Sequence, residues 1–185
     1  PPGAGIYNKV YIEKRPELYV SDVFVRPLID NNTVEVWVEI FNTHFDYRDF
    51  QLKLQVFSEN FDLGEVCDVE CRPKAAGPGI NLYKFELGFE NYRLWTTQEP
   101  WLYTLRASIK SGEITDEFDR TFGMRKFHMD CHSAPKGRLY LNNDPIILRG
   151  ANDMGHMQQC VVKNDMKQLI DDILIARLAN MNFYR

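Results

Sequence analysis

Hydrophobic and polar residues alternate with a period of two through most of the chain up to residue 122. In 33–41 every second residue is aliphatic, and the residues between them are Glu35, Trp37 and Glu39. Because successive side chains of a strand point to opposite faces, this alternation predicts strands with one face in a core. The side chains predicted to face the core here and in 50–57 are Val34, Val36, Val38, Ile40, Leu52, Leu54 and Val56. Further strands are predicted at 6–13, 18–29, 64–72, 80–87, 103–110 and 113–122.

Short turn signals separate these stretches. Asp-Asn-Asn occupies 30–32, a loop rich in glycine and proline occupies 75–79, and Ser-Gly occupies 111–112. About seven strands joined by such turns, with no helical pattern before residue 160, predict a mainly β fold. The expected architecture is an immunoglobulin-like antiparallel β-sandwich over 17–127, without the Cys-Trp-Cys spacing of antibody domains.

The pattern changes beyond residue 127. Residues 128–136 have the composition of a linker, and the apolar run 146–148 lacks polar alternation, which predicts a strand covered on both faces. After a polar loop, apolar residues recur at helical spacing over 166–181, with Asn164 as the expected N-cap. Residues 182–185 predict a second strand. A buried strand, a helix and a strand are typical of the first βα unit of an α/β barrel or a doubly wound sheet.

The apolar stripe of the predicted helix needs a cover that one βα unit cannot supply. We expect the stripe to pack on the sandwich or on another copy of the chain. Its residues are Met166, Leu169, Ile170, Ile173, Leu174, Leu178 and Met181. The incomplete unit also predicts that the chain is cut from a longer protein, as does its start, which is not a signal peptide.

The charge and composition of the chain limit the classes of partner that we expect. Hydrophobic residues make up 44% of the chain, as in ordinary globular proteins, and the net charge is −4. Without a basic cluster, nucleic acid and anionic membrane are not expected partners. No apolar run approaches the length of about 18 residues that a transmembrane helix needs, and no feature indicates a compartment. On an extended strand Cys67 and Cys71 would lie roughly 13 Å apart, so we expect free thiols.

Residues with metal-binding or catalytic chemistry show no recognised spacing. We predict neither a metal site nor a cofactor, because the histidines and cysteines of the C-terminal part fit no zinc pattern. These residues are His128, Cys131, His132, His156 and Cys160. Asp171 and Asp172 are adjacent on the predicted helix and point apart, which indicates a solvated face rather than an acid–base pair. Trp95 and Trp101 could stack on a sugar or plug one end of the sandwich, and the sequence leaves both open.

Asn152, Asp153 and His156 directly follow the predicted buried strand. Active sites of (β/α)₈ enzymes lie at this end of the strands. A polar loop without any ligand contact would give the same pattern. Position alone therefore leaves a binding role and a plain loop equally open.

Six segments resemble, in order, motifs of the family 2 glycoside hydrolases, the group of β-galactosidases, β-glucuronidases and β-mannosidases. LWTTQEPWLYTL resembles the family's LW-x-x-x-x-P-x-LY-x-L, and FGMRKF resembles the FG-x-R that ends its middle domain. LNNDPIILRGAN resembles LNG-x-P-x-x-L-x-G-x-N at the start of its catalytic barrel, and NFYR resembles the N-x-x-R of barrel strand two. GIYNKVYI and VFVRP resemble the end of its jelly roll and the first strand of its middle domain. The segments occupy 5–12, 23–27, 94–105, 122–127, 141–152 and 182–185.

The resemblance implies three parts. Residues 1–16 would end a sugar-binding jelly roll, 17–127 would be the sandwich, and 128–185 a linker and the start of a truncated (β/α)₈ barrel. It also implies a retaining β-glycosidase with a carbohydrate substrate and two catalytic glutamates on later barrel strands. No catalytic residue is then expected in this chain, which by itself should be inactive. The substrate-binding positions it implies are Asn152, Asp153, Met154 and Arg185, the last of them beside the nucleophile.

One departure from the family pattern concerns the sugar. Many β-galactosidases and β-glucuronidases have His-Glu where this chain has Met154 and Gly155. A thioether cannot donate a hydrogen bond to a sugar hydroxyl, so the sugar stays open. Two alternatives are a non-catalytic carbohydrate-binding or architectural module and an adhesion-type domain that binds another protein. The adhesion-type hypothesis predicts a chain that ends near Phe127. The strand and helix predicted beyond Phe127 argue against this hypothesis.

Overall fold

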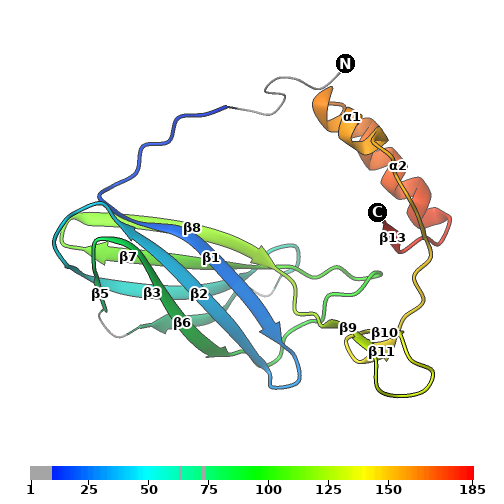
Figure 1. Cartoon of the computed structure of the whole chain (residues 1–185), viewed down its shortest axis with the longest axis horizontal. Coiled ribbons are helices and arrows are strands. Elements are labelled where there is room, and N and C mark those ends of the chain that lie inside the picture. Colours follow the sequence, from blue (N-terminus) through cyan, green and yellow to red (C-terminus); the bar gives the residue numbers. More distant parts are fainter. Residues whose placement is uncertain (1–9, 63, 72–73) are drawn as a thin grey trace. The chain divides into compact units, whose positions relative to one another are not determined.

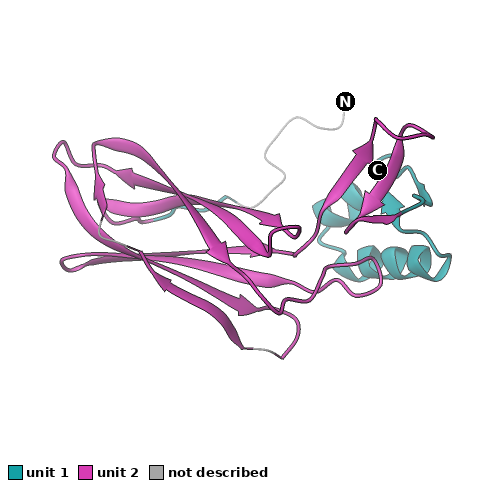
Figure 2. Cartoon of the chain, turned by 90° about the horizontal axis from the view of Figure 1, so that it is seen from below, with its two compact units in different colours: residues 1–13, 146–185 teal, residues 14–145 magenta. Residues whose placement is uncertain are grey.

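The computed structural model describes residues 10–62, 64–71 and 74–185. Two compact units make up the chain (Figure 2). The larger unit comprises 14–145, and the smaller comprises 1–13 together with 146–185.

The larger unit is a sandwich of two antiparallel sheets (Figure 1). One sheet has the strand order β1–β2–β6, and the other has the order β4–β3–β7–β8, with the short β5 also paired to β3. This order confirms the predicted immunoglobulin-like sandwich. Its strands are β1 (Leu18–Leu28), β2 (Thr33–Asn42), β3 (Arg48–Ser58), β4 (Glu65–Glu70), β5 (Lys74–Ala76), β6 (Gly79–Gly88), β7 (Tyr103–Ser111) and β8 (Ile114–Phe122).

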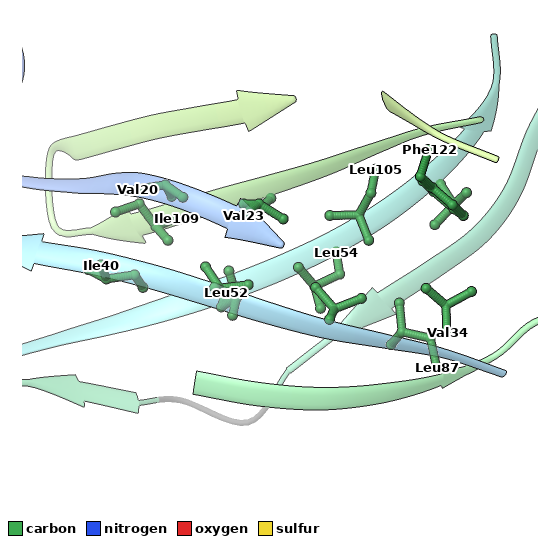
Figure 3. Packing of buried hydrophobic residues seen from close by; sticks show 14 of the residues in the cluster. Val20, Val23, Val34, Ile40, Leu52, Leu54, Leu87, Leu105, Ile109 and Phe122 are labelled. Atoms are coloured by element: carbon green, nitrogen blue, oxygen red, sulfur yellow. The ribbon is translucent and has the colours of Figure 1, made fainter. Parts of the chain in front are cut away.

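The core lies between the two sheets and is built by the faces that the alternation predicted (Figure 3). The predicted inward residues of β2 and β3 are all buried, with Val36 and Leu54 at 0% exposure. Each such aliphatic side chain contributes about 1.5–3 kcal/mol when it leaves water. The predicted loop 75–79 begins within β5, because Lys74–Ala76 pair with the edge of β3 instead of leaving the sheet.

Aromatic rings close one end of this core. Tyr103 is fully buried, lies edge-on to Phe61 and Phe89, and its hydroxyl accepts a hydrogen bond of 2.7 Å from the Arg93 backbone N–H. Trp101 packs edge-on against Phe61 at 5.2 Å, and the Arg93 guanidinium lies 4.7 Å from the centre of its ring. Trp101 is therefore part of the plug at the end of the sandwich, which was one of its two predicted roles.

β1 belongs to one sheet but is also tied to β8 of the other. Its register shifts between Val20 and Asp22, as at a β-bulge. The Val20 N–H donates to the Asp116 carboxylate at 2.9 Å, and Arg120 Nε donates to the Val23 carbonyl at 2.7 Å. Two backbone groups on this edge of the first sheet are thus satisfied by side chains of the second.

Glu35 is a buried charge on the face of β2 opposite the predicted core. The residue is only 6% exposed. Its carboxylate pairs with Arg26 at 2.9 Å and with Lys84, and it accepts a hydrogen bond of 3.0 Å from Trp37 Nε1. These donors, first Lys84 and then Trp37, lower the pKa of Glu35. Neighbouring long side chains therefore bury a charge on the outer face.

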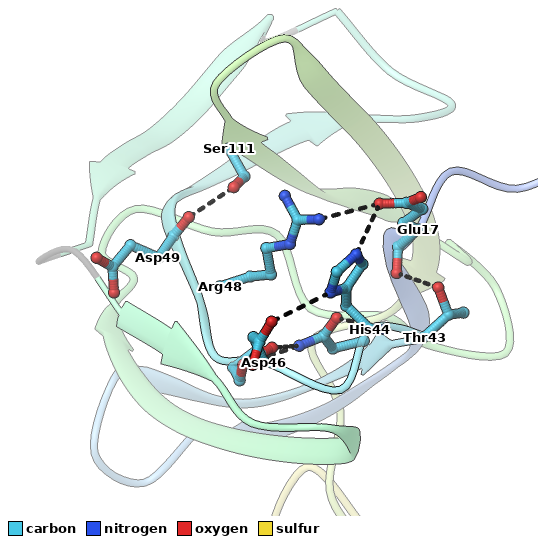
Figure 4. Close-up of polar contacts among 9 residues, drawn as sticks. Glu17, Thr43, His44, Asp46, Arg48, Asp49 and Ser111 are labelled. Atoms are coloured by element: carbon cyan, nitrogen blue, oxygen red, sulfur yellow. Dashed lines mark hydrogen bonds and ion pairs between the residues drawn. The ribbon is translucent and has the colours of Figure 1, made fainter.

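A polar network shapes the loop between β2 and β3 (Figure 4). The Glu17 carboxylate lies 3.1 Å from Arg48 Nη2 and 4.0 Å from His44 Nε2, and its backbone carbonyl accepts from the Thr43 hydroxyl at 3.0 Å. The buried Asn42 donates to the Asp46 carbonyl at 2.9 Å. These contacts tie the loop and the strand ends beside it to one another, so the network holds the loop in place.

Residues 128–136, predicted as a linker, begin in a strand. β9 (Phe127–Asp130), β10 (Arg138–Leu141) and β11 (Asp144–Pro145) form a small antiparallel sheet in the larger unit. The turn at Asn142 and Asn143 places both residues at positive φ, which asparagine tolerates well. The Asn142 side chain accepts from the Lys126 N–H at 3.0 Å and donates to the Trp95 carbonyl at 2.9 Å. We call this pair of bonds the Asn142 clasp.

The strand predicted at 6–13 is not found in the residues that the structure describes. Residues 10–13 have no strand structure, and Val10, Tyr11 and Ile12 are exposed. Residues 6–9 lie outside the described part of the chain. Alternation predicts an amphipathic segment, but a strand also requires a partner, and the part of the chain that the structure describes offers none to 10–13.

In the smaller unit two parallel strands are joined by two helices (Figure 1). These are β12 (Gly150–Ala151), α1 (His156–Val162), α2 (Met166–Leu178) and β13 (Phe183–Tyr184). The predicted helix and second strand are present, but the first strand lies at Gly150–Ala151 rather than 146–148. Ile147 is exposed, so the prediction of a strand covered on both faces is wrong for the described chain. No helix of the described residues is long and apolar enough to span a membrane.

Asn164, the expected N-cap of the predicted helix, instead ends α1, a helix that the sequence did not predict. Asn164 at φ 58° ends α1, donating from its N–H to the Val161 carbonyl, while the Asp165 N–H bonds the Cys160 carbonyl. This is a Schellman motif. The N-cap of α2 is Asp165, whose carboxylate accepts from the Gln168 N–H at 3.1 Å. Asn180 ends α2 in the same way as Asn164 ends α1.

Candidate functional site

The candidate site lies where β12 and β13 end. Gly150 is opposite Phe183, and Ala151 is opposite Tyr184 in a parallel ladder. A β-carbon on residue 150 would lie 2.1 Å from the carbonyl oxygen of Phe183. The two backbones therefore approach so closely that the position requires glycine.

Backbone bonds continue this ladder past the strand ends. The Arg185 N–H donates to the Ala151 carbonyl at 3.2 Å, and the Asp153 N–H donates to the Arg185 carbonyl at 3.0 Å. Asn152 and Arg185 thus lie side by side at the carboxyl ends of two neighbouring parallel strands. The structure brings these two predicted site residues together, and their role in binding a sugar stays a prediction.

A set of hydrogen bonds that sequence reasoning missed fixes the strands behind this pair. The Arg149 N–H donates to Asn182 Oδ1 at 2.8 Å, and the Asn182 N–H donates to the Arg149 carbonyl at 2.8 Å. Arg149 Nε also donates to the Asn180 carbonyl at 3.0 Å. The sequence shows only that polar residues flank the helical segment, and their spacing does not predict a contact between them.

Asp153, predicted to bind substrate, has a structural role. Its Oδ1 accepts from the backbone N–H groups of Gly155 at 3.1 Å and His156 at 2.8 Å, and more weakly from Met157. The first N–H groups of a helix have no carbonyl partner within the helix, so the carboxylate caps the start of α1. It also sets the direction in which the chain leaves the site.

Met154 extends into solvent between these residues. It is 88% exposed, and its sulfur lies 3.1 Å from Asn152 Nδ2. The amide of Asn152 is therefore held toward the thioether, which is only a weak acceptor. A sugar hydroxyl is a better acceptor, so Asn152 remains available to a ligand.

His156 does not point back to this site but contacts α2. Its Nε2 lies 2.7 Å from Asp172 Oδ2 and 3.9 Å from Cys160 Sγ. Asp171 instead pairs with Lys167 at 2.6 Å. The two adjacent aspartates do point apart, as predicted, but Asp172 forms part of a polar cluster rather than a solvated face.

Residues 146–185, which carry this site, contain no glutamate. The four aspartates of 146–185 already have structural partners. Asp153 and Asp165 cap the two helices, Asp171 binds Lys167, and Asp172 binds His156. The site therefore has an amide and a guanidinium at its edge but no free carboxylate pair.

The apolar stripe of α2 is exposed in the described chain. Ile170 and Leu174 are 54% and 52% exposed, and Ala176 is the buried residue of this helix. What covers the stripe stays a prediction.

Comparison with protein families decides the identity of the larger unit. The model of the glycosyl hydrolases family 2 matches residues 18–125, more than half of the chain. The chain belongs to glycosyl hydrolase family 2. The match confirms the family resemblance, and its range spans all the strands of the sandwich.

Relatives by sequence agree with this family. A β-galactosidase of Priestia megaterium is 26% identical over 98% of this chain and 18% of its own length, and one of Leuconostoc mesenteroides is 25% identical with the same coverage. The chain therefore spans about 18% of the length of these family 2 relatives.

Solved structures share the fold. Bacteroides uniformis β-glucuronidase 2, covalently bound to cyclophellitol-6-carboxylate aziridine, has a TM-score of 0.66 at 16% identity, over 92% of this chain and 21% of that one. A β-galactosidase from Bacteroides fragilis, described as putative, has a TM-score of 0.62 at 16% identity, over 75% and 22%. At these identities the likeness concerns the fold.

Proposed function

We propose that this chain is an internal part of a retaining β-glycosidase, in which the sandwich is a scaffold and the smaller unit begins the catalytic (β/α)₈ barrel. Asn152 and Arg185 then form one edge of the sugar site, with Met154 beside them and Asp153 as the support of the loop. The catalytic acid and the nucleophile are glutamates outside these 185 residues.

The observation that carries the proposal is the parallel pairing of β12 and β13. In (β/α)₈ enzymes the active site lies at the carboxyl ends of parallel strands, and here those ends carry an amide and a guanidinium side by side. An amide can donate to a sugar hydroxyl, and a guanidinium can hold a carboxylate in place. Both groups suit a site in which a carboxylate attacks the anomeric carbon.

The absence of glutamate beyond Glu117 supports the proposal that the catalytic glutamates belong to another part of the full-length protein. A retaining mechanism needs two carboxyl groups about 5–5.5 Å apart, and the aspartates of 146–185 are held by other partners. The 185-residue chain by itself should then hydrolyse no β-glycoside.

The test uses the full-length protein and a panel of aryl β-galactosides, β-glucuronides, β-mannosides and β-glucosides. We expect turnover of one class with retention of anomeric configuration, seen by proton NMR of the first product. The exchanges Asn152→Ala and Arg185→Ala should each lower kcat/KM by about 10²-fold or more, as for loss of a donor at a developing charge. Lys167→Ala, on the exposed side of α2, is the matched control and should leave kcat/KM unchanged.

The same assay separates this proposal from a non-catalytic binding module. A module predicts no turnover by the full-length protein and sugar binding by the 185-residue chain alone. Turnover by the 185-residue chain would contradict the assignment of the catalytic residues. Equal activity of the Asn152→Ala, Arg185→Ala and Lys167→Ala proteins would contradict the proposed site.

A further inference from the structure

Three side chains with metal-binding chemistry converge between α1 and α2. His156 Nε2, Cys160 Sγ and one carboxylate oxygen of Asp172 all lie within 4.8 Å of one another. His156 and Cys160 are one helical turn apart on α1 and therefore share a face, and Asp172 reaches them from α2. The arrangement comes from two elements that the sequence separates, which is why spacing did not reveal it.

We propose that His156, Cys160 and Asp172 form a zinc-binding site that joins α1 to α2. Imidazole, thiolate and carboxylate are all ligands of Zn²⁺, and three protein ligands leave the fourth position for water or another ligand. The sulfur and nitrogen donors do not suit Ca²⁺ or Mg²⁺, which prefer oxygen. This inference does not depend on the proposed glycosidase activity.

Two of the three separations between ligand atoms need only a small adjustment to hold zinc, and the third lies within 4.8 Å. Tetrahedral zinc with bonds of about 2.0–2.3 Å places its ligand atoms roughly 3.5 Å apart. The observed separations are 3.9 Å from His156 Nε2 to Cys160 Sγ and 2.7 Å from His156 Nε2 to Asp172 Oδ2. A shift of the imidazole away from Asp172 and toward the thiol would bring both separations to the required value. Zinc would replace the hydrogen bond between the imidazole and the carboxylate.

A supporting contact orients the carboxylate. Gln168 Nε2 donates to Asp172 Oδ1 at 2.8 Å, which leaves Oδ2 for the ion. Outer hydrogen bonds of this kind are typical of metal-binding carboxylates. Because His156 is 60% exposed in its side chain, an ion can enter from solvent.

The surrounding charge favours a cation. The Cys160 thiol is buried, and the carboxylates of Asp172 and Asp165 act on it. A dication would displace the thiol proton, and thiolate and carboxylate together would neutralise the charge of the ion.

The experiment titrates the reduced, metal-free 185-residue chain with Zn²⁺ by calorimetry and with Co²⁺ by absorption, with a non-thiol reductant. We expect one tight site, a thiolate-to-cobalt charge-transfer band and d–d bands of tetrahedral intensity. Cys160→Ser should abolish the charge-transfer band, and Gln168→Ala should weaken Zn²⁺ binding about 10–100-fold. Cys131→Ser changes an exposed cysteine of the larger unit and is the matched control, which should bind as the unchanged chain does.

X-ray absorption of the zinc-loaded chain provides an independent measurement. One sulfur and one imidazole in the first coordination shell are expected, and far-UV circular dichroism checks that each variant is folded. Absence of a stoichiometric site, or binding by a folded Cys160→Ser chain equal to that of the unchanged chain, would overturn the proposal. Displacement of Zn²⁺ by equimolar Ca²⁺ would overturn it as well.

Discussion

Gly150 and Phe183 approach so closely that a β-carbon on Gly150 would lie 2.1 Å from the Phe183 carbonyl oxygen. That oxygen belongs to the backbone, so the clash cannot be relieved by the movement of a side chain. The parallel pairing of β12 with β13 depends on glycine at residue 150. The juxtaposition of Asn152 and Arg185 depends in turn on that pairing.

Gly150→Ala should therefore separate the two strands. The amides of Asp153 and Arg185, which donate across the pair, should lose protection in hydrogen exchange. Gly88→Ala is the control, since a β-carbon there would meet nothing within 4 Å. Unchanged protection in Gly150→Ala would show that the strands are not paired in this way.

Substitution of Asp153 tests whether this predicted site residue acts by capping α1. Asp153→Ala should destabilise α1 by about 0.5–2 kcal/mol, because it removes the acceptor for the N–H groups of Gly155 and His156. Asp153→Asn retains the cap and should restore the helix, as measured by circular dichroism during urea unfolding. If the full-length protein hydrolyses glycosides as proposed, activity that recovers with Asp153→Asn indicates support of the loop, and activity that stays low indicates direct contact with substrate.

Leu54 tests the centre of the sandwich. It has no exposed surface, so Leu54→Ala should lower the free energy of unfolding by about 2–5 kcal/mol. Phe24, on the outer face of β1, is 57% exposed. Phe24→Ala should change the unfolding midpoint in urea much less, and a larger effect there than at Leu54 would contradict the observed orientation of the sheets.

Glu35 should make the stability of the sandwich dependent on pH. Its pKa is lowered in the folded chain, chiefly by Lys84 and then by Trp37, so its contribution is present above the ordinary glutamate pKa of 4.5 and is lost as the pH falls through the folded value. Glu35→Gln should lower the melting temperature at pH 7, and the difference from the unchanged chain should close as the pH falls below the ordinary glutamate value. Glu86→Gln on the neighbouring strand is the control. A difference that widens in acid would contradict this account.

The sequence predicted the sandwich well because each strand of its core alternates by itself. Val36 and Leu54 could be placed from their neighbours in the chain, and the strand order then follows the immunoglobulin pattern. Glu35 could not be placed, since its burial depends on side chains of two other strands. Periodicity detects which face is apolar but not which charges a neighbour will cover.

For the candidate site, sequence reasoning identified positions but not partners. It placed Asn152 and Arg185 at strand ends, and the register of β12 and β13 brings them together. It missed that Asp153 caps α1, because the cap is only visible once α1 itself is found. It also missed Asp172 as the partner of His156, because that contact joins two helices.

The Asn142 clasp determines where the sandwich can be cut. Asn142 follows the last strand of the sandwich by twenty residues, yet its side chain satisfies the Lys126 N–H and the Trp95 carbonyl. A chain shortened to Phe127 would retain every strand from β1 to β8 and still lose the partner of both groups. The smallest piece that folds with these groups paired should therefore end after Pro145, with the β9–β11 sheet included.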